Sequence, residues 1–171
     1  YSAGEQGYIV AWDREASGNY DVRARLLDSA GIPASPDFLV NSYTTAGQVN
    51  PDVDRSREGS FTVVWNGAGS GDDSGVFGRR FDAAGAALGA EFLVNSFTTS
   101  SQQQPRISMD ASANFVVSWL SAGSPGTDNS QTSAQGRAFL AVRMRRFASA
   151  LPLFADGFES ANPQAWSATV P

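Results

Sequence analysis

The hydrophobic positions of this chain fall in short runs that are separated by glycine, serine, asparagine and aspartate. Three of these runs, at residues 8–12, 61–65 and 115–119, are rich in β-branched and aromatic residues, which favours β-strands. No stretch keeps the 3.6-residue period of an amphipathic helix. The pattern therefore predicts an all-β fold of many short strands joined by turns.

The same pattern returns at a nearly constant spacing. Trp12, Trp65 and Trp119, which end the three runs, are 53 and 54 residues apart, and the segments DFLVNSYTT and EFLVNSFTT are 54 residues apart. Fixed spacing of this kind is typical of a repeat protein. We interpret residues 1–150 as a repeat region with copies at about 7–58, 59–112 and 113–150, followed by a tail at 151–171.

Each copy predicts four short strands. In the second copy they are FTVVW, an arginine-bearing run that ends in DAAG, then FLVNS and QPRISMD. The third copy carries a polar insertion near residues 121–137, which we expect to form an enlarged surface loop. Four strands in a unit of this length are typical of a β-propeller blade, and a β-sandwich or a stacked β-solenoid is the alternative.

About two and a half blades fit in the chain, whereas a propeller has to close into a ring. Open blade faces and strand edges favour association with other strands. We therefore expect the ring to be completed by another copy of the chain or by an upstream part of the same protein. The chain begins with Tyr1 instead of methionine, and we expect it to be a piece of a longer protein.

Composition excludes several kinds of chemistry. The chain has no histidine and no cysteine, which removes serine–histidine and cysteine–histidine nucleophiles, thiol redox chemistry and zinc sites. All 12 basic residues are arginine, and the formal net charge of −5 argues against nucleic acid as a partner. No apolar run is long enough to span a membrane as a helix.

The three repeated tryptophans have two interpretations. Trp12, Trp65 and Trp119 could stack on the apolar face of a sugar and so form a glycan-binding surface. Because aromatic residues dominate core energetics and each copy places the residue identically, packing within or between blades is the favoured interpretation.

Three arginines are repeated in the same way. Arg25, Arg79 and Arg145 could bind an anionic ligand through bidentate hydrogen bonds. The favoured interpretation is that each pairs with a carboxylate or with carbonyl groups of a neighbouring strand.

Without histidine and cysteine the chain offers only oxygen ligands to a metal ion, which points to calcium or magnesium, and we predict no cofactor other than calcium. Asp72 and Asp73 lie in the glycine-rich segment 69–75, and Asp128 lies in a weaker parallel within the insertion. Such loops bring carboxylate and carbonyl oxygens together, as a hard cation requires. A solvated turn is the favoured interpretation. Paired carboxylates could also serve glycoside hydrolysis, but the acidic residues fall mostly in turns, so we predict no catalytic residues.

The repeat resembles tandem units of long bacterial surface and secreted proteins. The segments that carry the resemblance are Gly59 to Trp65, Asp72 to Gly85, Glu91 to Thr98 and Gln102 to Ile107. It covers about residues 7–150 and implies a propeller-like extracellular repeat with no catalytic motif. The first copy departs from it, because REASGNYD replaces the acidic glycine-rich loop.

The tail resembles a segment near the C-terminus of many secreted proteins of Gram-negative bacteria. The match runs through Phe154, the run from Asp156 to Ser160, and Trp166, with Ala161 where glycine is usual. This similarity implies export and a sorting or attachment role. The alternative is a final edge strand whose aromatic residues cover apolar surface.

Together these features predict a non-catalytic, secreted or cell-surface repeat module of a Gram-negative bacterium. Its expected role is ligand binding or adhesion, with a glycan or a cell-surface protein as the partner. The first alternative is a structural, export or assembly segment of a larger exoprotein, and the second is a fragment of a secreted hydrolase.

Overall fold

The structure is a computed structural model that describes residues 7–16, 18–122 and 141–147. These residues form ten strands and no helix, which confirms the all-β prediction for the described part of the chain. The strands are β1 (Tyr8–Ala16), β2 (Asn19–Leu27), β3 (Phe38–Leu39), β4 (Gln48–Arg55), β5 (Phe61–Gly69), β6 (Asp72–Phe81), β7 (Phe92–Leu93), β8 (Gln102–Met109), β9 (Phe115–Ser121) and β10 (Ala141–Phe147).

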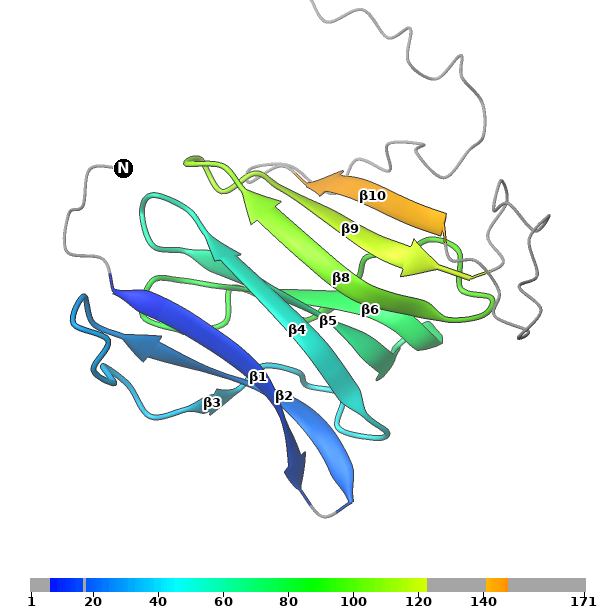
Figure 1. The fold of residues 1–171 in the computed structure, drawn as a ribbon, viewed down its shortest axis with the longest axis horizontal. Coiled ribbons are helices and arrows are strands. Elements are labelled where there is room, and N and C mark those ends of the chain that lie inside the picture. The colour runs from blue at the N-terminus through cyan, green and yellow to red at the C-terminus, as the bar shows by residue number, and fades with distance from the viewer. Residues whose placement is uncertain (1–6, 17, 123–140, 148–171) are drawn as a thin grey trace, which may run out of the picture.

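The strands form three antiparallel sheets that are stacked one after another (Figure 1). Sheet A has the order β1-β2-β3, sheet B has β4-β5-β6-β7, and sheet C has β8-β9-β10. Within the described residues the sheets do not close into a ring. Most of the predicted insertion at 121–137 and the whole tail at 151–171 lie outside the described residues.

Each sheet is offset by one strand from the sequence copies. Strand β4 comes from the end of the first copy but pairs with β5 of the second, and β8 pairs with β9 in the same way. Both β4 and β8 contain a bulge, at which Asn50 and Gln104 have φ values of 54° and 51°. The prolines that follow are tolerated there because a bulge interrupts the ladder of hydrogen bonds.

Two hydrophobic cores cover the two faces of sheet B, because alternate residues of a strand point to opposite faces. The core between sheets A and B contains Val22, Ala24, Val40, Phe61, Val63, Trp65, Phe77 and Phe81. The core between sheets B and C contains Val64, Val76, Val94, Phe115, Val117, Trp119 and Phe147. Sheet B is therefore buried on both faces, which explains why all five residues of the run FTVVW are buried.

The predicted FLVNS strands are much shorter than expected. Strands β3 and β7 each contain only two residues, because an asparagine side chain then takes over the pairing. Asn41 Oδ1 accepts a hydrogen bond from the N–H of Val22 at 2.8 Å, and Asn95 Oδ1 accepts one from the N–H of Val76 at 2.7 Å. A side-chain acceptor satisfies the backbone and lets the chain turn away from the sheet.

None of the described segments forms a helix with the length and apolar character needed to cross a bilayer.

Candidate functional site

Two of the three repeated tryptophans lie in the cores between sheets. Trp65 and Trp119 are 1% and 2% exposed. The indole Nε1 of Trp65 donates to Gln48 Oε1 at 3.1 Å, and that of Trp119 donates to Gln102 Oε1 at 3.2 Å. A buried indole needs such a partner, because an unbonded N–H would lose its hydrogen bond to water without replacement. These two rings have no face open to a sugar.

Two of the three repeated arginines connect neighbouring sheets. Arg79 of β6 donates from Nη1 to the carbonyl oxygen of Val40, next to sheet A, at 2.9 Å. Arg145 of β10 makes the equivalent bond to the carbonyl oxygen of Val94, next to sheet B, at 2.6 Å. Each guanidinium also lies over a phenylalanine of its own strand, at 5.7 and 5.4 Å from the ring centre. Each arginine therefore holds its own sheet against the preceding one.

Sheet A presents the same positions on a face that no described sheet covers. Tyr8, Val10 and Trp12 match Phe61, Val63 and Trp65, but Tyr8 is 60% exposed and Val10 is 42% exposed. Trp12 is half-buried. Their cross-strand partners Leu27, Arg25 and Arg23 lie on the same face, because residues opposite one another in an antiparallel pair point to the same side. We call this surface the outer face of sheet A.

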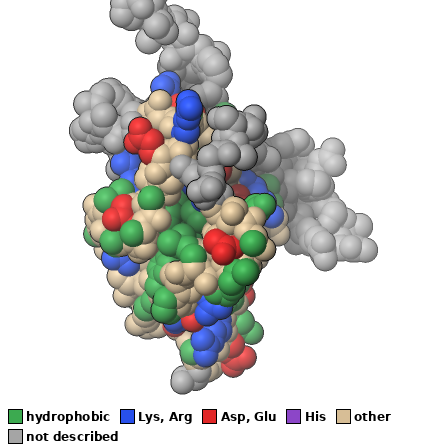
Figure 2. Space-filling view, turned by 90° about the vertical axis from the view of Figure 1, so that its left-hand side faces the viewer, with side chains coloured by type: hydrophobic (Ala, Val, Ile, Leu, Met, Phe, Trp, Pro, Cys, Tyr) green, Lys and Arg blue, Asp and Glu red, His purple; other side chains and the backbone are tan. Residues whose placement is uncertain are grey.

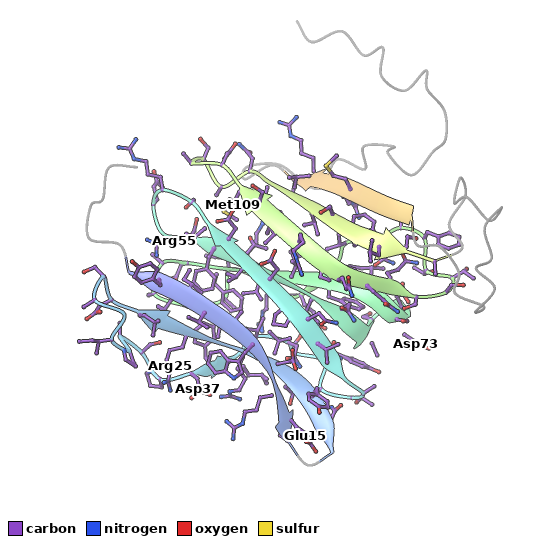
Figure 3. The ribbon with its side chains drawn as sticks, viewed as in Figure 1. Glu15, Arg25, Asp37, Arg55, Asp73 and Met109 are labelled. Carbon is purple, nitrogen blue, oxygen red and sulfur yellow. The ribbon has the colours of Figure 1, made fainter. Side chains whose placement is uncertain are left out.

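Charged groups lie at the β3 side of the outer face. Asp37 accepts a hydrogen bond from Arg23 Nε at 2.5 Å and one from Arg25 Nη2 at 3.3 Å. The Nη1 atom of Arg14 lies 3.9 Å from Asp37 Oδ2. The hydrogen bond from Arg23 lowers the pKa of Asp37 below its ordinary value of 3.8, although desolvation acts in the opposite direction. Arg25 keeps one unsatisfied group, because its buried Nε has no hydrogen-bond partner among the described residues. Figure 3 shows Arg25 and Asp37 together beside β3.

The predicted calcium ligands lie elsewhere. Asp73 is exposed at the opposite end of the molecule from Arg25 and Asp37 (Figure 3). Asp72 is buried, and its two oxygens accept hydrogen bonds from the N–H of Ser74 at 2.9 Å and from Asn95 Nδ2 at 2.7 Å. Asp128 lies outside the described residues.

A hollow of about 540 Å³ adjoins this loop, and it is lined by Gly71, Asp72, Asp73, Ser74, Thr98, Ser100 and Ser101. Within the described ranges, no three acidic side chains come close enough to hold one metal ion. Calcium binding remains a prediction.

Besides the outer face of sheet A and the hollow, a third surface is formed by the start of β1 and by the loops that follow β2 and β6. Figure 2 shows hydrophobic side chains gathered on this side of the molecule, with arginine and acidic side chains around them. The large hydrophobic residues that are most exposed on these elements are Tyr8, Ile32 and Leu88. Only Tyr8 belongs to the outer face of sheet A.

Sequence reasoning missed the glutamine and asparagine partners. Gln48 and Gln102 are 1% exposed or less, and each lies 17 residues before its tryptophan. Asn41 and Asn95 are buried as well. The signal that could have found them is the 54-residue spacing within each pair, because polar residues repeated at fixed spacing beside apolar strands indicate shared hydrogen bonds.

Comparisons of the chain with protein-family models, with curated proteins and with solved structures found no match. The candidate site therefore rests on the geometry of the molecule. Its outer face combines exposed aromatic and aliphatic groups, an arginine with one unsatisfied N–H group and an edge of β1 that no described strand pairs with. Such a surface is suited to binding another polypeptide.

Proposed function

We propose that the chain is a non-catalytic β-propeller-type repeat module of a secreted or cell-surface bacterial protein. Its role is assembly, and it acts by docking against a further sheet of the same repeat type. The observation that carries this proposal is the outer face of sheet A, which has the residues of a sheet-to-sheet contact but no described sheet on it. The β-propeller arrangement and the extracellular location rest on the repeat pattern and its resemblance.

The contacts between described sheets indicate what the docking sheet provides. Besides the bond from Arg79 to Val40, Glu91 Oε2 accepts a hydrogen bond from the N–H of Ser42 at 2.7 Å. Glu91 and Arg79 of sheet B correspond to Asp37 and Arg25 of sheet A. A preceding sheet would thus offer a carbonyl oxygen to Arg25 and a backbone N–H to Asp37.

The sharpest experiment adds a neighbouring sheet in front of residues 7–171, in place of residues 1–6. A copy of residues 48–113 is fused in front of Gly7, because residue 114 of the third copy corresponds to Gly7 of the first. The fusion supplies one complete sheet and the first strand of sheet A. We expect the melting temperature to rise by about 5 °C or more, since each kcal/mol shifts it by about 2–4 °C at this size.

The matched control is the same fusion with Val10→Asp, which places a charge in the new contact and should cancel most of the gain. The proposal fails if the fusion melts at the temperature of the original chain. It also fails if the added segment unfolds in a separate transition.

Glycan binding is the second candidate function, and the observation that favours it is Trp12. Its side chain is half-buried beside Arg23, so it is the repeated tryptophan with a ring accessible to a sugar. Reproducible hits on a glycan array that are lost in Trp12→Ala would favour this function. Binding unchanged by Trp12→Ala would count against it.

A further inference from the structure

The edge of β1 that no described strand pairs with indicates a more specific binding site, and this inference rests on the proposed function. We propose that this edge binds an extended strand of another polypeptide segment with the pattern Gln-x-x-Pro-Asp-x-Asp. The bound strand pairs antiparallel with β1 and becomes the first strand of sheet A. Addition of a strand to an open sheet edge is a common mode of peptide recognition, in which main-chain hydrogen bonds give affinity and side chains give specificity.

The described strands leave one edge of β1 without a partner. Strand β1 pairs with β2 alone, whereas the matching strands β5 and β9 pair on both edges. In sheet B the register places Gln48 opposite Gly67 and Asp54 opposite Thr62. Transferred by 53 residues, this register places the glutamine of the bound strand opposite Arg14 and its second aspartate opposite Ile9.

The neighbouring sheet leaves room for such a strand. Strand β4 of sheet B contacts β1, and β8 of sheet C contacts both β4 and β5. The N–H of Asn50 donates to Asp13 Oδ1 of β1, as the N–H of Gln104 donates to Asn66 Oδ1 of β5. Because β5 keeps its contact with β8 while its edge pairs with β4, the contact of β1 with β4 is compatible with a strand at the β1 edge.

The glutamine of the pattern follows from the tryptophans. The first strand of sheets B and C supplies the glutamine that accepts the indole hydrogen bond of Trp65 or Trp119. Trp12 is the matching residue of sheet A, and the indole–glutamine bonds of the described residues involve Trp65 and Trp119 but not Trp12. A glutamine on the bound strand would supply this acceptor.

The two aspartates of the pattern follow from the contact between first strands. Asp52 Oδ2 accepts a hydrogen bond from the N–H of Ile107 at 2.9 Å, and Asp54 Oδ2 accepts one from the N–H of Met109 at 2.8 Å. The matching N–H groups on β4 belong to Val53 and Arg55, and that of Arg55 already donates to Asp54 Oδ1 at 2.8 Å. The first aspartate of a strand at the β1 edge would therefore face the N–H of Val53, the second would lie beside Arg55, and the proline would occupy the bulge.

The test uses the full chain and a synthetic peptide with the sequence of residues 46–57, labelled and capped at both ends. We expect saturable binding by fluorescence anisotropy, together with shifts of the β1 amide signals in NMR spectra. A peptide with Gln48→Ala should bind about 5-fold more weakly, because one hydrogen bond is lost. A peptide with Asp52→Asn and Asp54→Asn should also bind more weakly, because neutral acceptors form weaker hydrogen bonds.

The Trp12→Phe variant of the chain tests whether the weaker binding of the Gln48→Ala peptide is due to the lost hydrogen bond with the indole. It keeps an aromatic ring but has no N–H donor, so the original and Gln48→Ala peptides should bind it with equal affinity. The inference is overturned if a scrambled peptide binds as well as the original. It is also overturned if no binding occurs at peptide concentrations up to about 1 mM.

The outcomes separate this inference from the proposed function. A fusion that stabilises the chain together with a peptide that does not bind would leave the docking of a sheet in place and overturn strand binding. Peptide binding without stabilisation by the fusion would support strand binding and overturn the docking of a complete sheet.

Discussion

Sheets A and B carry the same pattern of residues in different surroundings. Phe61 and Trp65 of sheet B are each 1% exposed, because sheet A covers them, whereas Tyr8 of sheet A is 60% exposed and Trp12 is half-buried. A repeat unit thus defines a contact surface, and the neighbouring unit determines whether this surface becomes a core.

The repeated arginines of the two sheets differ in their hydrogen-bond partners. Arg79 reaches the carbonyl oxygen of Val40 on the preceding sheet, while Arg25 turns to Asp37 within its own sheet and leaves its Nε unsatisfied. An arginine without its neighbour thus keeps part of its hydrogen-bonding capacity.

Truncation of the tryptophans should give the largest contrast between the sheets. Trp65→Ala should lower the free energy of unfolding by about 3–5 kcal/mol, because it removes a buried ring and leaves a cavity. Trp12→Ala should lower it by about 1 kcal/mol or less, because the ring is partly solvated in the folded chain. Urea unfolding of both variants measures the difference, and equal losses would contradict the comparison.

The glutamines give the next effect. Gln48→Ala should cost about 1–3 kcal/mol, because it leaves the buried Trp65 indole N–H and the carbonyl oxygen of Ala68 without their hydrogen bonds. Gln103→Ala, at a half-buried site, serves as the control and should cost about 0.5 kcal/mol or less. Urea unfolding of both variants and of the original chain measures the two losses of stability. Similar losses at the two sites would show that the Trp65 contact contributes little.

The inter-sheet arginine should matter less than the core. Arg79→Ala should cost about 1.5 kcal/mol, because its charge-assisted hydrogen bonds to the carbonyl oxygens of Val40 and Gly89 are lost. Arg25→Ala should cost about 0.5 kcal/mol or less, because its ion pair with Asp37 is partly exposed and its Nε has no hydrogen bond to lose. Thermal unfolding distinguishes the two variants. A larger loss of stability for Arg25→Ala than for Arg79→Ala would contradict the role of Arg79 in holding sheets A and B together.

The smallest expected effect is on how the free energy of unfolding depends on pH below neutrality. The pKa of Asp37 is lowered in the folded chain, so its ionised form contributes stability above its ordinary pKa of 3.8, and this contribution is lost as the pH falls through the lower folded value. Asp37→Asn should therefore be less stable at neutral pH, and the gap should close on acidification. Unfolding measured between about pH 7 and 2 tests this. A gap that does not change with pH would contradict the ion pair with Arg23.

The sequence predicted much of the fold and part of the candidate site. Alternation and the 53- to 54-residue spacing placed the main strands, and the spacing marked Trp12 and Arg25 as repeated positions. It did not show the one-strand offset between copies and sheets, because a repeat defines a period and not the point at which pairing begins. Nor did it identify Gln48 as a tryptophan partner, since that contact joins adjacent strands across a bulge.

Short strands with a repeated apolar face could be predicted from the residues alone, because local alternation depends only on neighbouring positions. Which of these faces are buried follows from the stacking of the sheets. Trp12, Trp65 and Trp119 are indistinguishable in their pattern, yet sheet stacking buries two of them fully and leaves the third half-buried on the outer face of sheet A. Burial depends on the neighbouring sheet, and the sequence of one repeat does not contain that neighbour.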